Sequence, residues 1–397
     1  MARKDRVALI KEIEKKRGSK VIVYITSDRQ NLAGQIGSDA VPVIERHLRG
    51  VIGPRTKRLD LFLYSTGGDA NMPWSLVSMI REYVGERPFS VLIPSRAYSA
   101  ATVIALGADE IVMAKSGELG PIDATIEKGP HNPREKETNA QLPISVEDVT
   151  GFFNLLQKVG LEEPSHKMDA FALLANQVHP LALGSVSRLL SQTELVAQQL
   201  LRTRREPLAD TDIENIIKQL SSEIYSHSHT VRRNEARRLG LKYVKDASVD
   251  EIEDDLWNLY SEYAEFFNFN DPFRPNDDMI LSDFEEKDWT GLPIACVEST
   301  SRKDVYTFDL RVRRLRNVPP TISINMPNLQ LAVPPIPDGL DNTQIQAFIN
   351  QIVTPMVQKQ IEVATKDATE KLLKALPAKG FEHVQTKAGW KLDRSKN

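Results

Sequence analysis

The sequence contains very little cysteine, since Cys296 is the only one among 397 residues. A single thiol excludes an intramolecular disulfide and a cysteine-based metal cluster, and it is typical of a protein kept in a reducing cytoplasm. Long apolar runs are also missing, because no stretch approaches the roughly 20 residues that a bilayer-spanning helix needs. The first 18 residues are charged throughout and lack the apolar centre of a signal peptide. We therefore expect a cytoplasmic protein without a transmembrane segment.

The chain also lacks an excess of charge of either sign. Its 51 lysine and arginine residues nearly balance 54 aspartate and glutamate residues, which gives a net charge of −3. Nucleic-acid binding usually requires a basic surface, so this balance argues against a nucleic-acid partner. Hydrophobic residues make up 41% of the chain, as in ordinary globular proteins. The length exceeds that of a usual single domain, so we expect a core domain with additions.

Short apolar runs alternate with segments of helix length in the first third of the chain. The runs cover residues 21–26, 61–64, 89–93 and 111–113. Such an alternation predicts parallel strands joined by crossover helices. The sequence therefore predicts an α/β fold built on a parallel sheet.

Two of the predicted strand-to-helix turns carry chemical interest. Gly67 and Gly68 follow one strand, and Ser99 opens an alanine-rich helix after the next. The first N–H groups of a helix have no intrahelical partner, and glycine lets a ligand approach the backbone closely. If the two strands are neighbours, these donors converge beside the Ser99 hydroxyl, an arrangement that acyl transfer requires. Each feature alone is more often an ordinary turn or an N-cap.

Taken together and in this order, the motifs resemble the serine dehydrogenase proteinase family, which is related to the Clp protease subunit and to signal peptide peptidase A. The segments that carry the resemblance are 65–68 (STGG), 97–106 (AYSAATVIAL), 108–113 (ADEIVM) and 119–123 (LGPID). A histidine-containing segment before Leu239-Gly240-Leu241 resembles the family's C-terminal signature. The resemblance implies a Clp/crotonase-like fold with helical additions and a small α+β C-terminal extension.

The resemblance also implies a catalytic triad of Ser99, His227 and Asp123. In this scheme Ser99 is the nucleophile, His227 is the base, and Asp123 orients the imidazole. The N–H groups of Gly68 and Ala100 bind the oxyanion, with Gly67 as the close alternative. The plainer interpretations are that Asp123 caps a turn and that the histidine caps a surface helix.

Other bases remain open. His229 lies two residues after His227, and His131 lies in a polar loop near the predicted site. Signal peptide peptidases use lysine, for which Lys115 and Lys128 are the local candidates. A metal site at the two neighbouring histidines is disfavoured because no carboxylate or cysteine cluster with ligand spacing accompanies them. We therefore expect no cofactor.

The sequence departs from the family at the site itself. Ala100 and Ala101 stand where relatives carry glycine, and Thr66 replaces the proline of Clp subunits. The added methyl groups affect the width of the site and leave activity open to test. A serine peptidase is the favoured function. The alternatives are a catalytically silent scaffold or adaptor and a crotonase-type acyl-CoA thioester enzyme.

The chain divides into a predicted Clp/crotonase-like domain over residues 1–245 and an extension over residues 246–397. We expect a first helix at 5–16, a helix at 249–267 opened by a Ser248–Glu251 capping box, a linker at 268–278 and a small β element. A proline-rich stretch, a long helix at 341–375 and a terminal hairpin at 381–392 should follow. The family resemblance implies a polypeptide substrate and a homo-oligomer. The apolar helix 183–204 and the aromatic helix 249–267 are the candidate interfaces, and the extension is a possible site for a protein partner.

Overall fold

The computed structural model describes residues 3–122, 125–126, 129–137, 139–223, 229–319 and 330–393. The chain forms two compact units. The main unit contains Met1–Phe273, Pro293–Thr307 and Ala388–Asn397, and the second unit contains Arg274–Leu292 and Phe308–Lys387. The predicted division at residue 245 remains a prediction.

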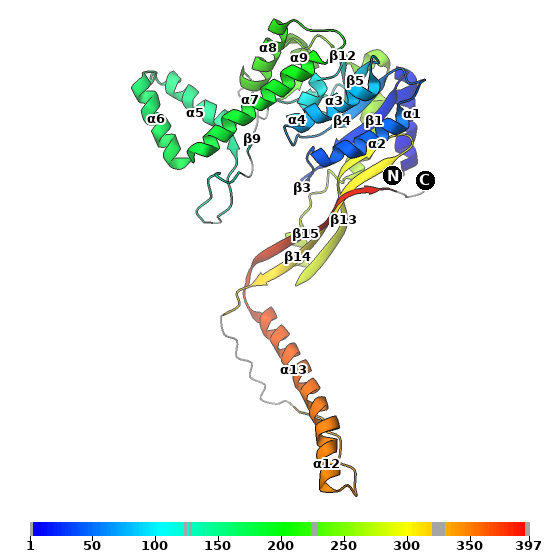
Figure 1. Cartoon of the computed structure of the whole chain (residues 1–397), viewed down its shortest axis with the longest axis vertical. Coiled ribbons are helices and arrows are strands. Elements are labelled where there is room, and N and C mark those ends of the chain that lie inside the picture. The colour runs from blue at the N-terminus through cyan, green and yellow to red at the C-terminus, as the bar shows by residue number, and fades with distance from the viewer. Residues whose placement is uncertain are drawn as a thin grey trace. The chain divides into compact units, whose positions relative to one another are not determined.

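A parallel sheet forms the centre of the main unit (Figure 1). Its strands lie in the order β12 (Val244–Asp246), β7 (Glu110–Met113), β5 (Phe89–Ile93), β4 (Leu59–Tyr64) and β1 (Lys20–Thr26). Each of these strands is parallel to its neighbour, whereas β13 (Glu286–Glu298) pairs antiparallel with β1. The sheet continues through β14 (Lys303–Arg316) and β15 (Ala378–Leu392), and β13, β14 and β15 each have residues in both units. The α/β fold with crossover helices is thus confirmed.

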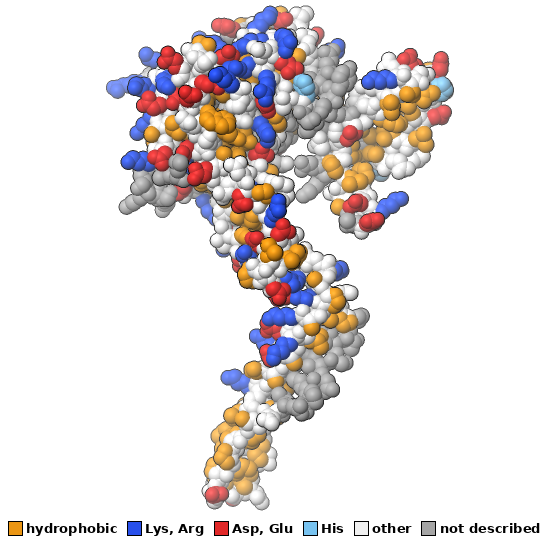
Figure 2. Space-filling view, turned by 180° about the vertical axis from the view of Figure 1, so that it is seen from behind, with side chains coloured by type: hydrophobic (Ala, Val, Ile, Leu, Met, Phe, Trp, Pro, Cys, Tyr) orange, Lys and Arg blue, Asp and Glu red, His pale blue; other side chains and the backbone are white. Residues whose placement is uncertain are grey.

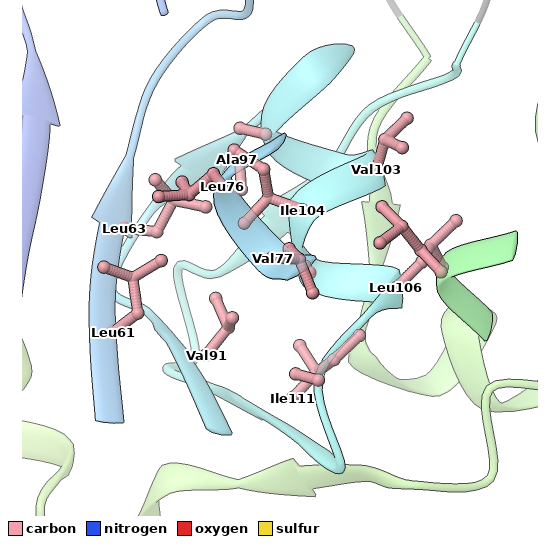
Figure 3. Packing of buried hydrophobic residues seen from close by; sticks show 14 of the residues in the cluster. Leu61, Leu63, Leu76, Val77, Val91, Ala97, Val103, Ile104, Leu106 and Ile111 are labelled. Atoms are coloured by element: carbon pink, nitrogen blue, oxygen red, sulfur yellow. The ribbon is translucent and has the colours of Figure 1, made fainter. Parts of the chain in front are cut away.

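Successive side chains of a strand point to opposite sides of a sheet, and helices cover both sides of this one. On one side Leu61, Leu63 and Val91 pack against α3 (Met72–Val84) and α4 (Ala100–Leu106), as Figure 3 shows. The helices α2 (Val41–Val51), α7 (Pro180–Arg202) and α8 (Asp210–Lys218) contribute to the same core. On the other side Phe62 and Leu92 belong to a second core with α1 (Arg3–Arg17) and α10 (Glu253–Phe266). Continuous apolar runs in the sequence are therefore strands buried on both faces.

Several further elements belong to the main unit. They are the three-stranded sheet β11 (Val231–Arg232), β8 (Glu118–Leu119) and β6 (Arg96–Ala97), the pair β2 (Asp28–Arg29) and β3 (Leu32–Ala33), the pair β9 (Thr125–Ile126) and β10 (Ile144–Ser145), and the helices α5 (Val146–Lys158), α6 (Pro164–Gln177) and α9 (Arg233–Arg238).

The second unit contains α11 (Pro275–Leu281), α12 (Asn342–Phe348) and α13 (Thr354–Ala375). Helix α12 begins with a capping box in which Asp341 and Gln344 bond each other's backbone N–H groups. Neither α12 nor α13 has a buried residue. No helix in the described part of the chain is long and apolar enough to cross a membrane.

Two local expectations in the C-terminal part are wrong. The Ser248–Glu251 capping box does not form, because Ala247–Asp250 is a 3-10 turn, Glu251 is left-handed with a φ of 56°, and α10 begins only at Glu253. The end of the chain is the single strand β15 rather than a hairpin.

Candidate active site

Ser99 occupies an unusual backbone conformation at the start of α4. Its φ is 51° and its ψ is −118°, values that residues with a side chain rarely adopt. The helix behind it is fixed, since every residue of α4 is buried and the Thr102 hydroxyl lies 2.7 Å from the carbonyl oxygen of Ala97. The Ser99 side chain makes no hydrogen bond to any described residue. The turn therefore holds a half-buried hydroxyl at a defined position.

The glycine turn after β4 lies directly against this serine. Gly67 has a φ of 124°, and a Cβ atom there would be 2.9 Å from the Cβ of Ser99. Gly68 has a φ of 155°, and a Cβ atom there would be 2.2 Å from the carbonyl oxygen of Ile36. Both positions therefore require glycine for conformation and for space.

The hydrogen bonds around the glycine turn leave the N–H of Gly68 free. The N–H of Ile36 donates to the carbonyl of Gly67 at 2.8 Å, and the N–H of Asp69 donates to the carbonyl of Ile36 at 2.9 Å. The N–H of Gly67 donates to the Ser65 hydroxyl at 3.1 Å. Within the described ranges, the N–H groups of Gly68 and Ala100 have no acceptor. Free donors near a serine hydroxyl are suited to binding an oxyanion.

These groups share one pocket of about 760 Å³. Its lining includes the loop 33–39, the turn 66–70, Ser99, Ala100 and Val103, and it is completed by Thr125, Leu189 and Thr193. The structure therefore brings together Ser99, Gly67, Gly68 and Ala100, which the sequence analysis singled out separately.

Asp123 and His227 lie outside the described residues. Several described residues near them in the sequence line the Ser99 pocket or pair with strands beside it. Thr125 lines the same pocket, and the N–H of Ile122 donates to the carbonyl of Leu220 at 3.0 Å. Val231 pairs with Leu119 in the sheet that also contains Ala97.

The reserve bases His229 and His131 each contact another described side chain. The Nε2 atom of His229 lies 2.8 Å from a carboxylate oxygen of Glu235, and the ring of His131 stacks on His179 with centroids 4.5 Å apart. The backbone N–H of Lys115 donates to Glu253, and Lys128 lies outside the described residues. The described lining of the Ser99 pocket contains none of these side chains. The part of the chain that the structure describes contains no His, Cys, Asp and Glu cluster able to hold a metal ion.

One network next to Ser99 was missed by the sequence analysis. The Tyr98 hydroxyl donates to one oxygen of Glu118 at 2.6 Å, and Arg232 donates to the other at 2.8 Å. Burial, with the hydrogen bond to Glu118, raises the pKa of Tyr98 to about 12. Glu118 and Arg232 are 114 positions apart in the sequence, so no local pattern indicates their contact.

Parts of this chain are similar to known proteins. Residues 1–160 match the model of the ClpP-like SDH-type serine proteinases. An uncharacterized protein of Methanocaldococcus jannaschii is 33% identical over 131 residues, which cover 32% of this chain and 44% of that protein. The chain therefore spans less than half the length of that relative.

Two further matches reach beyond residue 160. A second uncharacterized protein of the same organism is 24% identical over 263 residues, 65% of this chain and 79% of that protein. The solved structure of the 1510-N membrane-bound stomatin-specific protease is 17% identical and covers 60% of this chain and 85% of its own, with a TM-score of 0.33. The likeness to a family rests on the sequence model: residues 1–160 are similar to the ClpP-like SDH-type serine proteinases.

Proposed function

We propose that this protein is a serine peptidase in which Ser99 forms the acyl-enzyme. The observation that carries the proposal is the meeting of the strained Ser99 turn with the free N–H groups of Gly68 and Ala100 in one pocket. A hydroxyl and preorganised donors on opposite sides of one carbonyl are the minimal equipment for acyl transfer.

In the proposed mechanism Ser99 and the two N–H donors act from the pocket, and the roles of His227 and Asp123 are those that the family resemblance implies. The Ser99 oxygen attacks the peptide carbonyl, and the negative charge that develops on the carbonyl oxygen is held by the N–H groups of Gly68 and Ala100. His227 accepts the hydroxyl proton and gives it to the leaving amine, while Asp123 orients the imidazole. Water then attacks the acyl-enzyme ester by the same steps, which releases the carboxylic acid product and restores the Ser99 hydroxyl. We infer peptide bonds rather than esters as the substrates, because residues 1–160 match a family of proteinases.

The short sheet β11–β8–β6 supports the assignment of His227. His227 lies four residues before Val231, which pairs with Leu119, and Ala97 on the next strand lies two residues before Ser99. An extended residue spans at most about 3.6 Å, so the four residues from Val231 to His227 span at most about 14 Å. This limit keeps His227 near the small sheet that also carries Ala97. For Asp123, the support is that Thr125, two residues on, lines the Ser99 pocket.

The alanines after the nucleophile are compatible with an open site. Ala101 is completely buried in the core that α4 shares with the sheet and does not line the pocket. Ala100 lines the pocket but is only 3% exposed. The methyl group of Ala101 therefore occupies core volume rather than substrate volume.

Labelling with an uncharged fluorophosphonate probe tests the proposal. We expect labelling of the wild type and loss of labelling in Ser99→Ala and His227→Ala. Ser185→Ala is the matched control, because this partly exposed hydroxyl bonds the carbonyl of Leu181, accepts from Arg188 and lies outside the pocket. Loss in Ser99→Ala alone would move the base to His229, His131 or a lysine. A folded wild type that is not labelled but binds acyl-CoA would favour the crotonase-type enzyme, and one that does neither would favour the scaffold.

A further inference from the structure

The described lining of the pocket beside Ser99 is negatively charged. Asp39 and Asp69 are its charged residues within the described lining, which contains no lysine or arginine. Building on the proposed peptidase function, we propose that this pocket selects a positively charged substrate side chain, lysine or arginine, close to the scissile bond.

Asp69 is fixed next to the oxyanion donors. It directly follows Gly68, and its own N–H is held by the carbonyl of Ile36. Its carboxylate accepts hydrogen bonds from the backbone N–H of Asn71 at 2.9 Å and from the Asn71 side-chain amide at 3.1 Å. Both donors are neutral, so they orient the carboxylate without cancelling its charge.

Asp39 is fixed from the opposite end of the sequence. The indole N–H of Trp390 donates to its carboxylate at 2.7 Å. Trp390 is held in turn by an edge-to-face contact with Tyr306, with ring centroids 5.6 Å apart. Close by, Asp393 forms an ion pair with the buried Lys303 at 2.9 Å. All of these residues belong to the main unit. Trp390 therefore positions Asp39 in the pocket wall through a hydrogen bond from a second neutral donor.

The remaining lining suits the stem of a long cationic side chain. Leu189 provides partly exposed apolar surface in the pocket, and the buried Ile36, Pro73 and Val103 lie behind the same lining. A lysine or arginine can lay its methylene groups on such surface and extend its charged end to a carboxylate. Neither Asp39 nor Asp69 forms an ion pair with a described residue, so both charges attract a cation and repel an acidic substrate.

The expected preference is moderate because both carboxylates are exposed. An exposed ion pair changes an equilibrium by up to about fivefold, so two of them give roughly tenfold selectivity. Salt screens such charges and should reduce the preference.

The test uses full-length protein and matched quenched peptides that carry lysine, methionine or glutamate at one position beside the scissile bond. We expect kcat/KM to fall in the order lysine, methionine, glutamate, and the differences to shrink at high salt. Asp39→Asn and Asp69→Asn should each reduce the lysine-to-methionine ratio about threefold to fivefold, mainly through KM. Asp254→Asn removes an exposed carboxylate outside the pocket and should leave the ratio unchanged.

Trp390→Phe separates positioning from charge. It keeps an aromatic ring against Tyr306 but removes the N–H that holds Asp39, so the ratio should fall while the thermal unfolding midpoint stays near that of the wild type. Equal rates for the lysine and glutamate peptides, or an unchanged lysine preference in the Asp39→Asn/Asp69→Asn double variant, would overturn the inference. If Ser99 is still labelled by the uncharged probe, that failure leaves the peptidase proposal standing. Absence of labelling would instead overturn the peptidase function on which the inference rests.

Discussion

The conformation of Ser99 depends on the absence of a side chain at residue 67. A Cβ atom on Gly67 would approach the Ser99 Cβ to 2.9 Å, and both residues have a positive φ. A residue forced into such a conformation costs about 1–3 kcal/mol. We expect Gly67→Ala to slow fluorophosphonate labelling of Ser99 by about tenfold or more, and to lower the free energy of unfolding by about 1–3 kcal/mol. Labelling rates and urea denaturation measure the two effects.

Gly53→Ala is the control for the glycine prediction. Nothing lies within 4 Å of a Cβ atom at Gly53, and no positive φ is recorded for it, so labelling and stability should remain as in the wild type. Normal labelling of Gly67→Ala would show that Ser99 tolerates displacement and would contradict this account of the turn.

Another residue-scale prediction concerns the buried His47. Its ring nitrogens lie 2.9 Å from the Ser299 hydroxyl and 3.1 Å from a carboxylate oxygen of Asp304. Burial lowers the pKa of His47 below 6.5, although the nearby Asp304 opposes this shift. Burial alone would raise the pKa of Asp304, but hydrogen bonds from His47 and Arg302 outweigh it and lower that pKa to about 2, so Asp304 keeps its charge. The unfolded chain therefore binds a proton on this histidine at a higher pH than the folded chain does. Stability from His47 is present above about pH 6.5 and is lost as the pH falls through the folded pKa.

Urea denaturation at pH 7 and pH 5 measures this effect. The wild type should be less stable at pH 5, and His47→Gln should show a smaller difference between the two pH values. His383→Gln is the control, because His383 is exposed and bonds only Asn276. An identical pH dependence in wild type and His47→Gln would contradict the assignment.

At the scale of elements, the sheet β11–β8–β6 connects the nucleophile turn to the histidine segment. Glu118 on β8 bonds both Tyr98, next to Ser99, and Arg232 on β11. We expect Glu118→Gln to slow Ser99 labelling about tenfold with little change in stability, since a neutral amide weakens two charge-assisted hydrogen bonds. Arg232→Lys should retain part of the rate. Because Glu118 acts by positioning, a shifted pH profile of labelling distinguishes this role from a general loss of structure.

Glu82→Gln supplies the comparison for that experiment, because Glu82 is exposed on α3 and lies outside the pocket. If Glu118→Gln labels at the wild-type rate with the same pH profile, the network only joins strands and has no part in positioning the base.

The same elements show what local sequence patterns can and cannot predict. The strands β1, β4, β5 and β7 and the turns at Gly67 and Ser99 were predicted, because apolar runs and glycine or serine punctuation are local signals. The Ser248–Glu251 capping box was predicted wrongly, since packing of Ile252 in the core and the left-handed Glu251 decide where α10 begins. Contacts such as Trp390 with Asp39 join residues 351 positions apart, and only the assembled fold specifies them.

At the scale of the whole molecule, α5, α6 and the start of α7 form a lobe of the main unit with many exposed apolar side chains. Met168, Leu173 and Leu181 are more than half exposed, and Ala170 is the buried residue recorded for α6. Figure 2 shows hydrophobic side chains gathered over this lobe. By contrast, the stripe predicted on 183–204 is largely used inside the subunit, where Val186, Val196 and Leu200 are buried. Of the aromatic helix 249–267, Tyr263 and Phe267 are buried and Trp257 is half exposed.

A helix with so little buried surface requires a partner, because short helices gain most of their stability from packing an apolar face. We therefore predict a homo-oligomer in which α5 and α6 contact another copy of the chain. Analytical ultracentrifugation should give a mass above that of one 44.6 kDa chain. Met168→Asp and Leu173→Asp should shift the protein toward the monomer. Ile280→Asp is the matched control, because Ile280 on α11 is 61% exposed, close to the 66% of Leu173, but lies outside this lobe and outside the candidate interfaces, and its mass should match the wild type. A wild type that stays monomeric at high protein concentration would contradict the prediction and leave this apolar face to a different partner.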